Sequence, residues 1–415
     1  MVEVAAGRLP AWTAFAVVAG KVVAWMSRLV RLGRGGVIGG RVSLVLRPSA
    51  LQELCRGRVT VLVTGTNGKT TTTRLLTSAV AGLGEVACNE TGANMPDGLV
   101  AALARTPGAG HAVLEVDERY LPAVLADVDP AVVVLLNLSR DQLDRVGEVR
   151  RIEQSIRAAL SSCPATIVAN CDDVLVTSAA LDAPAPIWVS AGTAWRADST
   201  ACPRCGSVVQ ASGARWWCGC GLTRPDPQWT LGADSVLRSP DGRRVRLAPG
   251  LPGAVNTANA ANAVAAAVCL GVPLEDAAAA VGSVTDVDGR YRVVGYRNRA
   301  VRTLLAKNPA GWRETLEILS AGETPVVLAV NAREADGRDL SWLWDVPFER
   351  LRDRPVVACG ERATDLAVRL DYAEVPHQIV RDPLAAITRA APGPVDVVAN
   401  YTAFRDLSRR LGHAR

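Results

Sequence analysis

Residues 59–76 read VTVLVTGTNGKTTTTRLL and constrain the fold of this chain more than any other stretch. An apolar, β-branched run leads into a turn that contains Gly65 and Gly68, and a helical pattern begins at Lys69. Backbone N–H groups in such a turn, together with the N-terminus of the helix, bind phosphate oxygens. The sequence therefore predicts a strand, a phosphate-binding loop and a helix within an α/β fold.

The polar side chains of this turn suit a nucleoside triphosphate and its metal ion. The ammonium of Lys69 would reach the outer phosphates, and the hydroxyl of Thr70 would ligate Mg²⁺. Only three of the 46 basic residues are lysines, which makes each lysine a candidate for a specific role. The spacing departs from the general P-loop pattern, because Val63 stands where that pattern has a glycine. The residues expected to bind the nucleotide here are Gly65, Thr66, Asn67, Gly68, Lys69, Thr70 and Thr71.

A second apolar run, residues 111–118, ends in three carboxylates: Glu115, Asp117 and Glu118. Carboxylates at the carboxyl end of a parallel strand, beside a phosphate loop, are suited to hold Mg²⁺ between ATP and a substrate oxygen. Spacing alone does not show which of the three carboxylates holds the metal ion. A solvated acidic turn is the alternative.

Further apolar runs at 131–136 and 166–169 end in polar residues, as buried parallel strands do. Residues 88–98 are mostly small or polar and are expected to form a second loop over the nucleotide. The alternation of strand and helix patterns starts again at residue 301, with apolar runs at 326–330, 356–360 and 395–400. These patterns predict a doubly wound parallel sheet and a second, smaller Rossmann-like domain.

Four cysteines form two closely spaced pairs, Cys202 with Cys205 and Cys218 with Cys220. Four thiolates on two tight turns suit tetrahedral Zn²⁺. The chain has ten cysteines and no cleavable signal sequence, which favours a reducing cytoplasm over a disulfide framework. We expect a structural zinc ribbon at about 200–224, inserted in the ATP-binding domain.

Residues 11–30 carry apolar side chains at helical spacing, among them Trp12 and Trp25. Gly20 and Lys21 interrupt the segment, and no apolar run approaches the ~18 residues of a spanning helix. We expect a helix packed on the core, followed by a glycine-rich connection. The alternative is an interfacial helix in peripheral contact with the inner face of the membrane, supported by three arginines that follow it: Arg28, Arg31 and Arg34.

The motifs, in their order along the chain, resemble those of the Mur ligase family. They are T-G-T-N-G-K-T-T, the acidic strand end, N-x-x-x-D-Q-L-D, G-x-x-N-x-x-N-A and D-G-R, where x is any residue. The resemblance implies a central ATPase domain. It also implies nucleotide contacts from the motif residues Asn137, Asn256, Asn259 and Arg290.

The last part of the chain is similar to one branch of that family, the MurT family. K-N-P-A-G-W from Lys307, A-D-G-R-D-L-S-W-L-W-D from Ala335 and A-N-Y-T-A-F from Ala399 carry this similarity. G-A-N-M at residues 92–95 and the cysteine pairs extend it over nearly the whole chain. The resemblance implies an N-terminal helix and connection, a Mur-ligase-like ATPase domain and a Rossmann-like C-terminal domain, at 1–55, 56–290 and 291–415.

Departures from the Mur ligases that add amino acids suggest a different nucleophile. Gln142 stands where those ligases have a metal-serving histidine, and no lysine that could be carbamoylated lies between Lys69 and Lys307. By resemblance the nucleophile is ammonia. The α-carboxylate of D-glutamate in the stem peptide of lipid II would be amidated to D-isoglutamine through an acyl phosphate, with ATP and Mg²⁺.

The resemblance also implies a separate glutaminase subunit of the GatD type, which would form a heterodimer with this chain and supply the ammonia. In this family an aspartate of the C-terminal domain completes the Cys–His pair of that partner. Asp336, Asp339 and Asp345 are the candidates, and Asp339 is favoured. The other residues expected to serve catalysis are Lys69, Glu115, Glu118 and Lys307.

Two other functions fit parts of the sequence. One is an autonomous Mur-type or folylpolyglutamate-type ligase that adds an amino acid, and the missing lysine and histidine count against it. The other is a zinc-ribbon NTPase that binds nucleic acid. The net charge of +5 is spread along the chain, and the ribbon has no dense basic run, so we expect no nucleic-acid partner.

Overall fold

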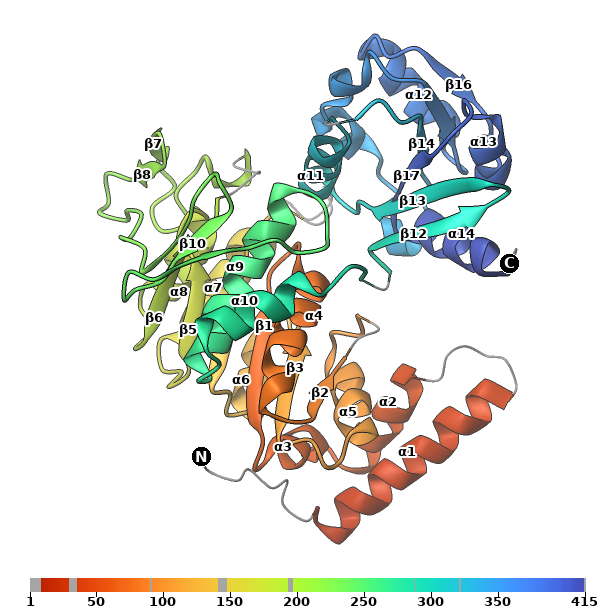
Figure 1. Cartoon of the computed structure of the whole chain (residues 1–415). Coiled ribbons are helices and arrows are strands. Elements are labelled where there is room, and N and C mark those ends of the chain that lie inside the picture. The colour runs from red at the N-terminus through yellow and green to blue at the C-terminus, as the bar shows by residue number, and fades with distance from the viewer. Residues whose placement is uncertain are drawn as a thin grey trace. The chain divides into compact units, whose positions relative to one another are not determined.

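The computed structural model describes residues 9–29, 36–89, 92–140, 148–192, 197–287, 289–320 and 322–413. The chain forms two compact units, each with its own main β-sheet (Figure 1). The first unit comprises Met1–Leu138, Arg150–Gly250 and Asn256–Thr285, and the second comprises Ser139–Val149, Leu251–Val255 and Asp286–Arg415.

A nine-stranded sheet forms the centre of the first unit, in the order β11-β10-β9-β6-β5-β4-β1-β3-β2. Its strands are β1 (Val59–Thr64), β2 (Val86–Cys88), β3 (His111–Glu115), β4 (Val132–Leu135), β5 (Thr166–Asn170), β6 (Pro186–Ser190), β9 (Trp229–Leu231), β10 (Val236–Arg238) and β11 (Arg244–Arg246). Neighbours from β2 to β9 are parallel, whereas β10 and β11 are antiparallel additions at one edge. The predicted α/β fold with a parallel sheet is therefore confirmed.

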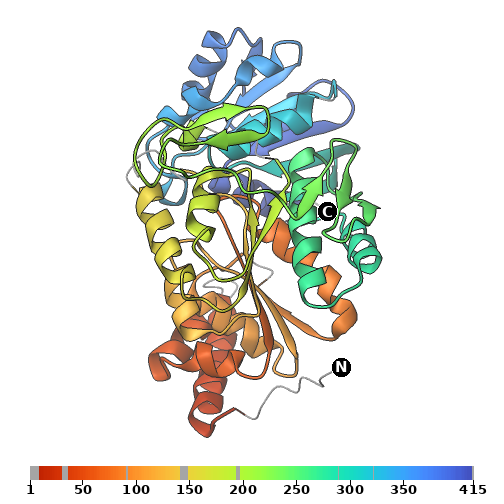
Figure 2. The ribbon, with the colours of Figure 1, turned by 90° about the vertical axis from the view of Figure 1, so that its left-hand side faces the viewer.

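Helices cover both faces of this sheet. The helices of this part of the chain are α1 (Ala11–Leu29), α2 (Gly36–Leu46), α3 (Ala50–Cys55), α4 (Lys69–Val80), α5 (Pro96–Arg105), α6 (Leu121–Asp127), α7 (Glu148–Leu160), α8 (Val174–Ala180), α9 (Ala254–Cys269) and α10 (Leu274–Gly282). Among them, α1 packs on α2, and α2 packs on α5. Figure 2 shows α7 on one side of the sheet and α4 and α10 on the other. Because both faces are covered, the central strand β4 is buried at every position, which explains its continuous apolar sequence.

Helix α1 forms where the apolar spacing predicted it, but only one of its faces is buried. Thr13, Ala16, Val17 and Gly20 face the protein. The opposite face is exposed and apolar. None of the helices in the described ranges has the length and apolar content needed to cross a bilayer.

The described part of the segment after α1, which begins at residue 36, is helical where we expected a glycine-rich connection at residues 33–41. It contains α2 and α3, and α2 packs along α1. A Cβ on Gly39 would lie 2.8 Å from the carbonyl oxygen of Gly20. The expectation was wrong because Gly39 does not interrupt a helix. It lies inside α2, where the missing side chain lets α1 and α2 approach closely.

The second unit has a six-stranded sheet in the order β12-β13-β17-β14-β15-β16. Its elements are β12 (Tyr291–Tyr296), β13 (Arg299–Leu305), α11 (Pro309–Ser320), β14 (Val326–Ala329), β15 (Val356–Cys359), α12 (Ala363–Tyr372), β16 (His377–Ile379), α13 (Pro383–Arg389), β17 (Val395–Ala399) and α14 (Tyr401–His413), with the short 3₁₀ segments η4 (Glu334–Asp336), η5 (Ser341–Asp345) and η6 (Phe348–Leu351). From β13 to β16 the neighbours are parallel. The strands expected at 326–330, 356–360 and 395–400 are confirmed.

Strand β12 was not predicted, and it pairs with β13 as an antiparallel hairpin. The turn between them places Arg297 and Asn298 at positive φ, 45° and 62°. Hairpin turns of this kind usually contain glycine, so the sequence Y-R-N-R gave no strong turn signal. On one side of this sheet the core is aromatic, with Trp312 packed against Trp342 and Phe348 at ring-centroid distances of 5.9 and 5.6 Å.

Candidate functional site

The predicted phosphate loop joins β1 to α4, and its two glycines adopt backbone conformations that disfavour other residues. The φ angle is +141° at Gly65 and +81° at Gly68. A Cβ on Gly68 would lie 2.6 Å from Oδ1 of Asn259, which comes from α9. The loop is therefore packed closely against one of the asparagines that the family motif predicted.

Asn137, which follows β4, holds the same loop through hydrogen bonds. Its Oδ1 accepts a bond from the N–H of Asn67 at 2.8 Å, and its Nδ2 donates to the carbonyl of Asn67 at 3.0 Å. The carbonyl of Asn137 accepts a bond from the N–H of Thr66 at 2.9 Å. These three bonds fix the path of the loop backbone, so Asn137 has a clear positioning role.

The Lys69 side chain is buried and paired with a carboxylate. Its Nζ donates to Oε2 of Glu118 at 2.9 Å and to the carbonyl oxygen of Thr66 at 3.2 Å, and it also contacts the carbonyl of Gly65. The side chains of the ion pair are only 8% and 9% exposed. Of the three carboxylates at the acidic strand end, Glu118 is therefore the one that pairs with the Lys69 ammonium.

Glu115, at the end of β3, contacts Thr70. The Thr70 hydroxyl donates to Oε2 of Glu115 at 2.8 Å, and Asn94 donates to Oε1 at 3.1 Å. The Glu115 backbone is held by Asn89, which accepts from its N–H and donates to its carbonyl, both at 2.8 Å. A hydroxyl and a carboxylate held this closely offer the hard oxygen ligands that Mg²⁺ prefers.

Asp117, the third carboxylate, is paired with Arg119. Its Oδ1 accepts bonds from Nε and from the backbone N–H of Arg119 at 3.0 and 3.1 Å. Burial alone would raise the pKa of Asp117, but the hydrogen bonds from Arg119, together with the positive charges of Lys69 and Arg119, outweigh it and lower the pKa below its usual value. The three carboxylates that spacing left unranked therefore have three different partners.

Asn89 and Asn94 are site residues that the sequence analysis did not single out. Both belong to the polar loop expected near the nucleotide, and the described part of this loop lies beside the phosphate loop. A Cβ on Gly92 would lie 3.8 Å from the Thr70 hydroxyl oxygen. Asn94 belongs to the G-A-N-M motif, which could have identified it.

The three candidate aspartates lie in the second unit, in different environments. Asp336 is buried, and its carboxylate accepts bonds from the backbone N–H of Thr402, at 2.9 Å, and from the Thr402 hydroxyl. Asp339 and Asp345 are exposed. A bond from the N–H of Ser341 to Asp339, at 2.8 Å, lowers the pKa of that aspartate.

Lys307 and Arg290 also belong to the second unit. The Lys307 ammonium lies 5.3 Å from the ring centroid of Tyr401, within range of a cation–π contact. Arg290 precedes β12, and its N–H donates to the carbonyl of Val287 at 3.0 Å. Asn256 lies in the first turn of α9. Gln142 and the aspartate of the D-G-R motif lie outside the described residues.

The four predicted cysteines come together. All four sulfur atoms lie within 4.8 Å of one another, with 3.7 Å between Cys202 and Cys220 and 3.4 Å between Cys205 and Cys218. At a Zn–S distance of about 2.3 Å the edge of a tetrahedron of sulfurs is about 3.8 Å, so the cluster has the right size for zinc. Hydrogen bonds from Ser207 lower the pKa of Cys205 to about 6, which favours the thiolate.

The cysteine segment lies between β6 and β9 and is anchored to the sheet by side chains. Trp216 is buried beside the cluster and donates from Nε1 to the carbonyl of Cys171 at 3.1 Å. Arg224 donates to Asp172, just beyond β5, at 2.7 Å in a largely buried ion pair. The cysteine cluster is therefore held against the carboxyl end of β5.

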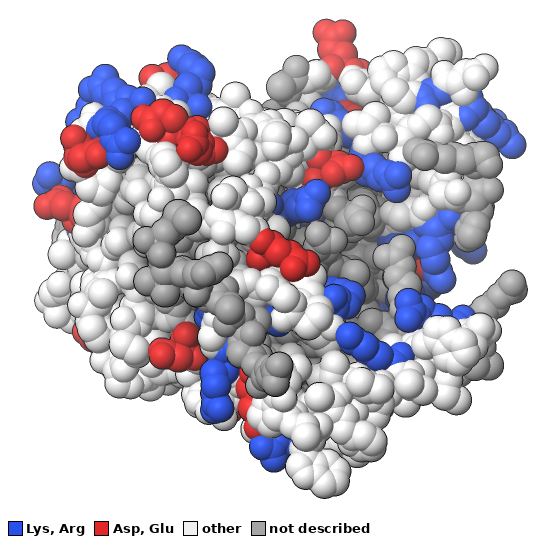
Figure 3. Space-filling view, turned by 60° about the horizontal axis from the view of Figure 1, so that its bottom comes forward, with Lys and Arg blue, Asp and Glu red and all other residues white. Residues whose placement is uncertain are grey.

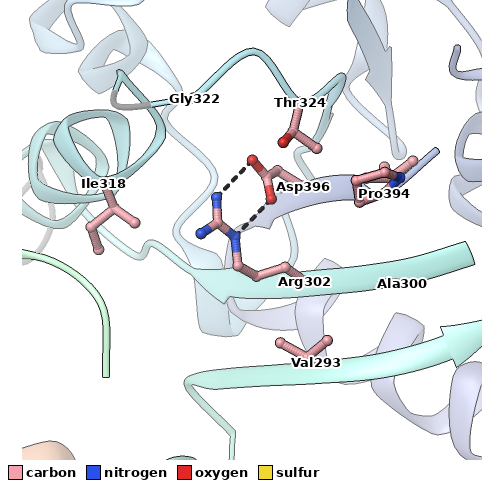
Figure 4. Close-up of a pocket in the computed structure, with 9 residues that line it drawn as sticks. Val293, Ala300, Arg302, Ile318, Gly322, Thr324, Pro394 and Asp396 are labelled. Atoms are coloured by element: carbon pink, nitrogen blue, oxygen red, sulfur yellow. Dashed lines mark hydrogen bonds and ion pairs between the residues drawn. The ribbon is translucent and has the colours of Figure 1, made fainter. Parts of the chain in front are cut away.

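A pocket of about 360 Å³ in the second unit is lined by none of the predicted site residues. Figure 4 shows its main polar feature, Arg302, which donates two hydrogen bonds to Asp396 at 2.7 and 2.8 Å. Arg354 also contacts Asp396, at 3.3 Å. The charges in this pocket are matched within the protein, and we interpret the pair as structural.

Comparison with known proteins is consistent with this geometry. The chain matches the Mur ligase middle domain over residues 63–268 and the MurT ligase C-terminal domain over residues 305–404. Among solved structures, a pseudomurein peptide ligase type C from Methanothermus fervidus has a TM-score of 0.67 at 18% identity, covering 88% of this chain and 80% of the other. MurF from Acinetobacter baumannii has a TM-score of 0.64 at 18% identity, covering 90% and 80%. The fold and the phosphate-loop site thus define a protein of the Mur ligase class.

Two relatives narrow the assignment within that class. The lipid II isoglutaminyl synthase (glutamine-hydrolyzing) subunit MurT of Streptococcus pneumoniae is 31% identical, over 91% of this chain and 93% of its own length. The MurT subunit of Staphylococcus aureus is 28% identical, over 92% and 94%. The chain belongs to the MurT family.

Proposed function

We propose that this chain is the ATP-dependent subunit of a lipid II isoglutaminyl synthase, a ligase that forms a C–N bond. It would convert the α-carboxylate of D-glutamate in the lipid II stem peptide to the amide of D-isoglutamine. The similarity to two MurT subunits over about nine-tenths of the chain carries the proposal. The buried arrangement of Lys69, Thr70 and Glu115 supports its ATP-dependent part.

The proposed reaction has two steps. An oxygen of the substrate carboxylate attacks the γ-phosphorus of ATP, the bond to the β,γ-bridging oxygen breaks, and ADP leaves. The acyl phosphate that results has the leaving group that a carboxylate lacks. Ammonia then attacks the acyl carbon, inorganic phosphate leaves, and the nitrogen loses a proton.

The residues of the first unit would serve the phosphoryl transfer. Lys69 would exchange its contact with Glu118 for the outer phosphates and stabilise charge on the transferred group. Thr70 and Glu115 would hold Mg²⁺, which neutralises phosphate charge when bound. The asparagines of the family motifs, Asn137, Asn256 and Asn259, would position the nucleotide together with Arg290. Lys307 is our proposed catalytic residue of the second unit.

A direct test is mass spectrometry of lipid II after incubation with ATP, glutamine and the chain co-expressed with a candidate glutaminase. Amidation replaces OH by NH₂ and makes the product about one mass unit lighter. That product should form only when both subunits are present. A product heavier by an amino-acid residue, formed without the partner, would instead identify an amino-acid-adding ligase.

A separate glutaminase is part of the proposal, because we recognise no cysteine in this sequence that could act as the nucleophile of glutamine hydrolysis. Cys359 is fully buried at the end of β15, and burial raises the pKa of its thiol far above neutrality. The exposed carboxylate of Asp339 would complete the Cys–His pair of the partner. Asp336 is less suited to that role, because its carboxylate is already bonded to Thr402.

Asp339→Asn should lower glutamine-dependent amidation by about 10²-fold, the usual range for loss of an acid–base contribution. Amidation supplied with ammonium chloride should stay unchanged, because that route bypasses the glutaminase. Asp345→Asn, at another exposed aspartate nearby in the sequence, is the matched control and should leave both activities intact. If the Asp345 variant lost glutamine-dependent amidation instead, Asp345 would be the residue that completes the Cys–His pair of the partner.

We propose that the cysteine cluster binds one structural Zn²⁺, which four thiolates would enclose completely. Cys202→Ser should therefore lose the metal, as measured by elemental analysis of the purified chain. Cys269→Ser is the matched control, because Cys269 is exposed and lies outside the cluster. A wild-type chain that contains no zinc, or a Cys202 variant that keeps a full equivalent, would contradict the site.

We also propose the domain boundaries 1–55, 56–290 and 291–415, with the zinc ribbon at about 200–224. The two family matches, at 63–268 and 305–404, fall within the second and third of these segments. The parallel strands β13 to β16 support a Rossmann-like character for the third.

A further inference from the structure

The exposed face of α1 carries a continuous apolar stripe. Its members are Trp12, Phe15, Val18, Val22, Trp25, Met26 and Leu29. At 3.6 residues per turn these seven positions fall within about 140° of the helix circumference. Trp12 and Trp25 are 75% and 57% exposed, so the two largest side chains of the stripe project from the protein near its two ends.

Contacts on the opposite face prevent this stripe from turning inward. A Cβ on Gly20 would lie 2.3 Å from the carbonyl oxygen of Gly39 in α2, so the two helices touch through their backbones. Ser43 of α2 donates to the carbonyl of Ala16 at 3.1 Å, and the Thr13 hydroxyl donates to buried Glu53 of α3. The stripe is therefore held outward by a packed and hydrogen-bonded inner face.

The charged residues of the segment that contains α1 are of one sign. No acidic residue occurs between Glu3 and Glu53, whereas the same segment contains seven basic residues: Arg8, Lys21, Arg28, Arg31, Arg34, Arg41 and Arg47. Exposed Lys21 and Arg28 lie along one edge of the stripe, about 60° of helix circumference or less from Trp25. Figure 3 turns the lower part of Figure 1, where α1 lies, toward the viewer and shows largely uncharged surface with basic and acidic groups at intervals.

We propose that α1 docks in the plane of a membrane surface that contains anionic lipids, with Trp12, Phe15 and Trp25 inserted between the head groups. Helices with an apolar face rich in Trp and Phe and with flanking Lys or Arg bind at this depth. Basic residues add attraction to anionic lipids. The docking would bring the first unit to the bilayer that holds a lipid-linked substrate, and in this respect it rests on the proposed function.

A second copy of the chain fits this face less well. A two-fold interface brings each residue near its own equivalent or its neighbours. Lys21 lies at the middle of α1, so it would meet another Lys21 or Arg28. Neither α1 nor α2 offers a carboxylate to pair with them.

The test uses the full chain, alone and co-expressed with its glutaminase, in sedimentation with vesicles of phosphatidylcholine with or without 30% phosphatidylglycerol. Wild type should partition at least about tenfold more strongly onto the anionic vesicles, with weaker binding at high salt. Val22→Glu with Trp25→Glu should lower that partition at least about tenfold. Val293→Glu is the matched control, because Val293 and Val22 are 53% and 49% exposed, and it should have no effect.

Three results would overturn the proposal: no vesicle binding by wild type, equal binding by the double variant, or loss of binding when the glutaminase is present. A fourth contradicting result would be a wild-type dimer, seen by sedimentation equilibrium without lipid, that the double variant disrupts. A turnover assay separates this proposal from the proposed function. The double variant should amidate detergent-solubilised lipid II normally but vesicle-bound lipid II slowly, and equal rates on both would contradict docking.

Discussion

Lys69→Ala is expected to lower ATP turnover by about 10³-fold, because it removes the one buried ammonium of the phosphate loop from the charge that develops on the transferred phosphoryl group. The assay is lipid II-dependent ADP release by the complex with the glutaminase. Lys21→Ala is the matched control, since Lys21 is an exposed lysine on α1. Normal turnover by the Lys69 variant would remove the phosphate-loop assignment.

The same substitution should also destabilise the chain, and the two effects can be separated. Lys69→Ala leaves the carboxylate of Glu118 buried without its cation, which we expect to lower the free energy of unfolding by about 3 kcal/mol. Adding Glu118→Gln removes the unpaired charge. The double variant should therefore recover much of the stability, measured by urea denaturation, while turnover remains low.

Glu115→Gln is expected to lower ATP turnover by about 10²-fold or more and to raise the Mg²⁺ concentration needed for half-maximal activity. Glutamine has nearly the same shape and can still accept the bond from Thr70, so the loss would reflect the missing charge on a metal ligand. A Mg²⁺ titration of turnover measures this.

Asp117→Asn provides the matched control for Glu115, two residues further along the chain. Because Asp117 is paired with Arg119, its variant should stay within about twofold of wild type in turnover and in Mg²⁺ requirement. A stronger Mg²⁺ effect in the Asp117 variant than in the Glu115 variant would reverse our assignment of the metal ligand.

Much of the first unit could be predicted from its sequence, because its central strands are buried on both faces. Such strands are apolar at every position, as in β4, and they end where polar residues begin. The phosphate loop was predictable for a different reason: positive φ at Gly65 and Gly68 and a lysine that follows them are local requirements.

The partners of Glu115 and Glu118 could not be predicted, because they come from elements other than the acidic strand end. Thr70 reaches Glu115 and Lys69 reaches Glu118 from α4, and Asn94 reaches Glu115 from the loop before α5. Spacing within one segment contains no information about such contacts. The same reason explains α2, because its Gly39 packs closely against α1 and its Gly40 against α5, and neither contact is visible in the sequence.

The cysteine segment is inserted between two neighbouring strands of the sheet, so its length can vary. The chain leaves β6 at Ser190 and returns at Trp229 on the neighbouring strand, where Val189 pairs with Trp229. A segment whose two ends lie side by side can be lengthened, shortened or replaced without changing the order of the strands. This position is therefore a natural point at which to insert a fluorescent or affinity tag, with Trp216 and Arg224 kept because they anchor the segment to the sheet.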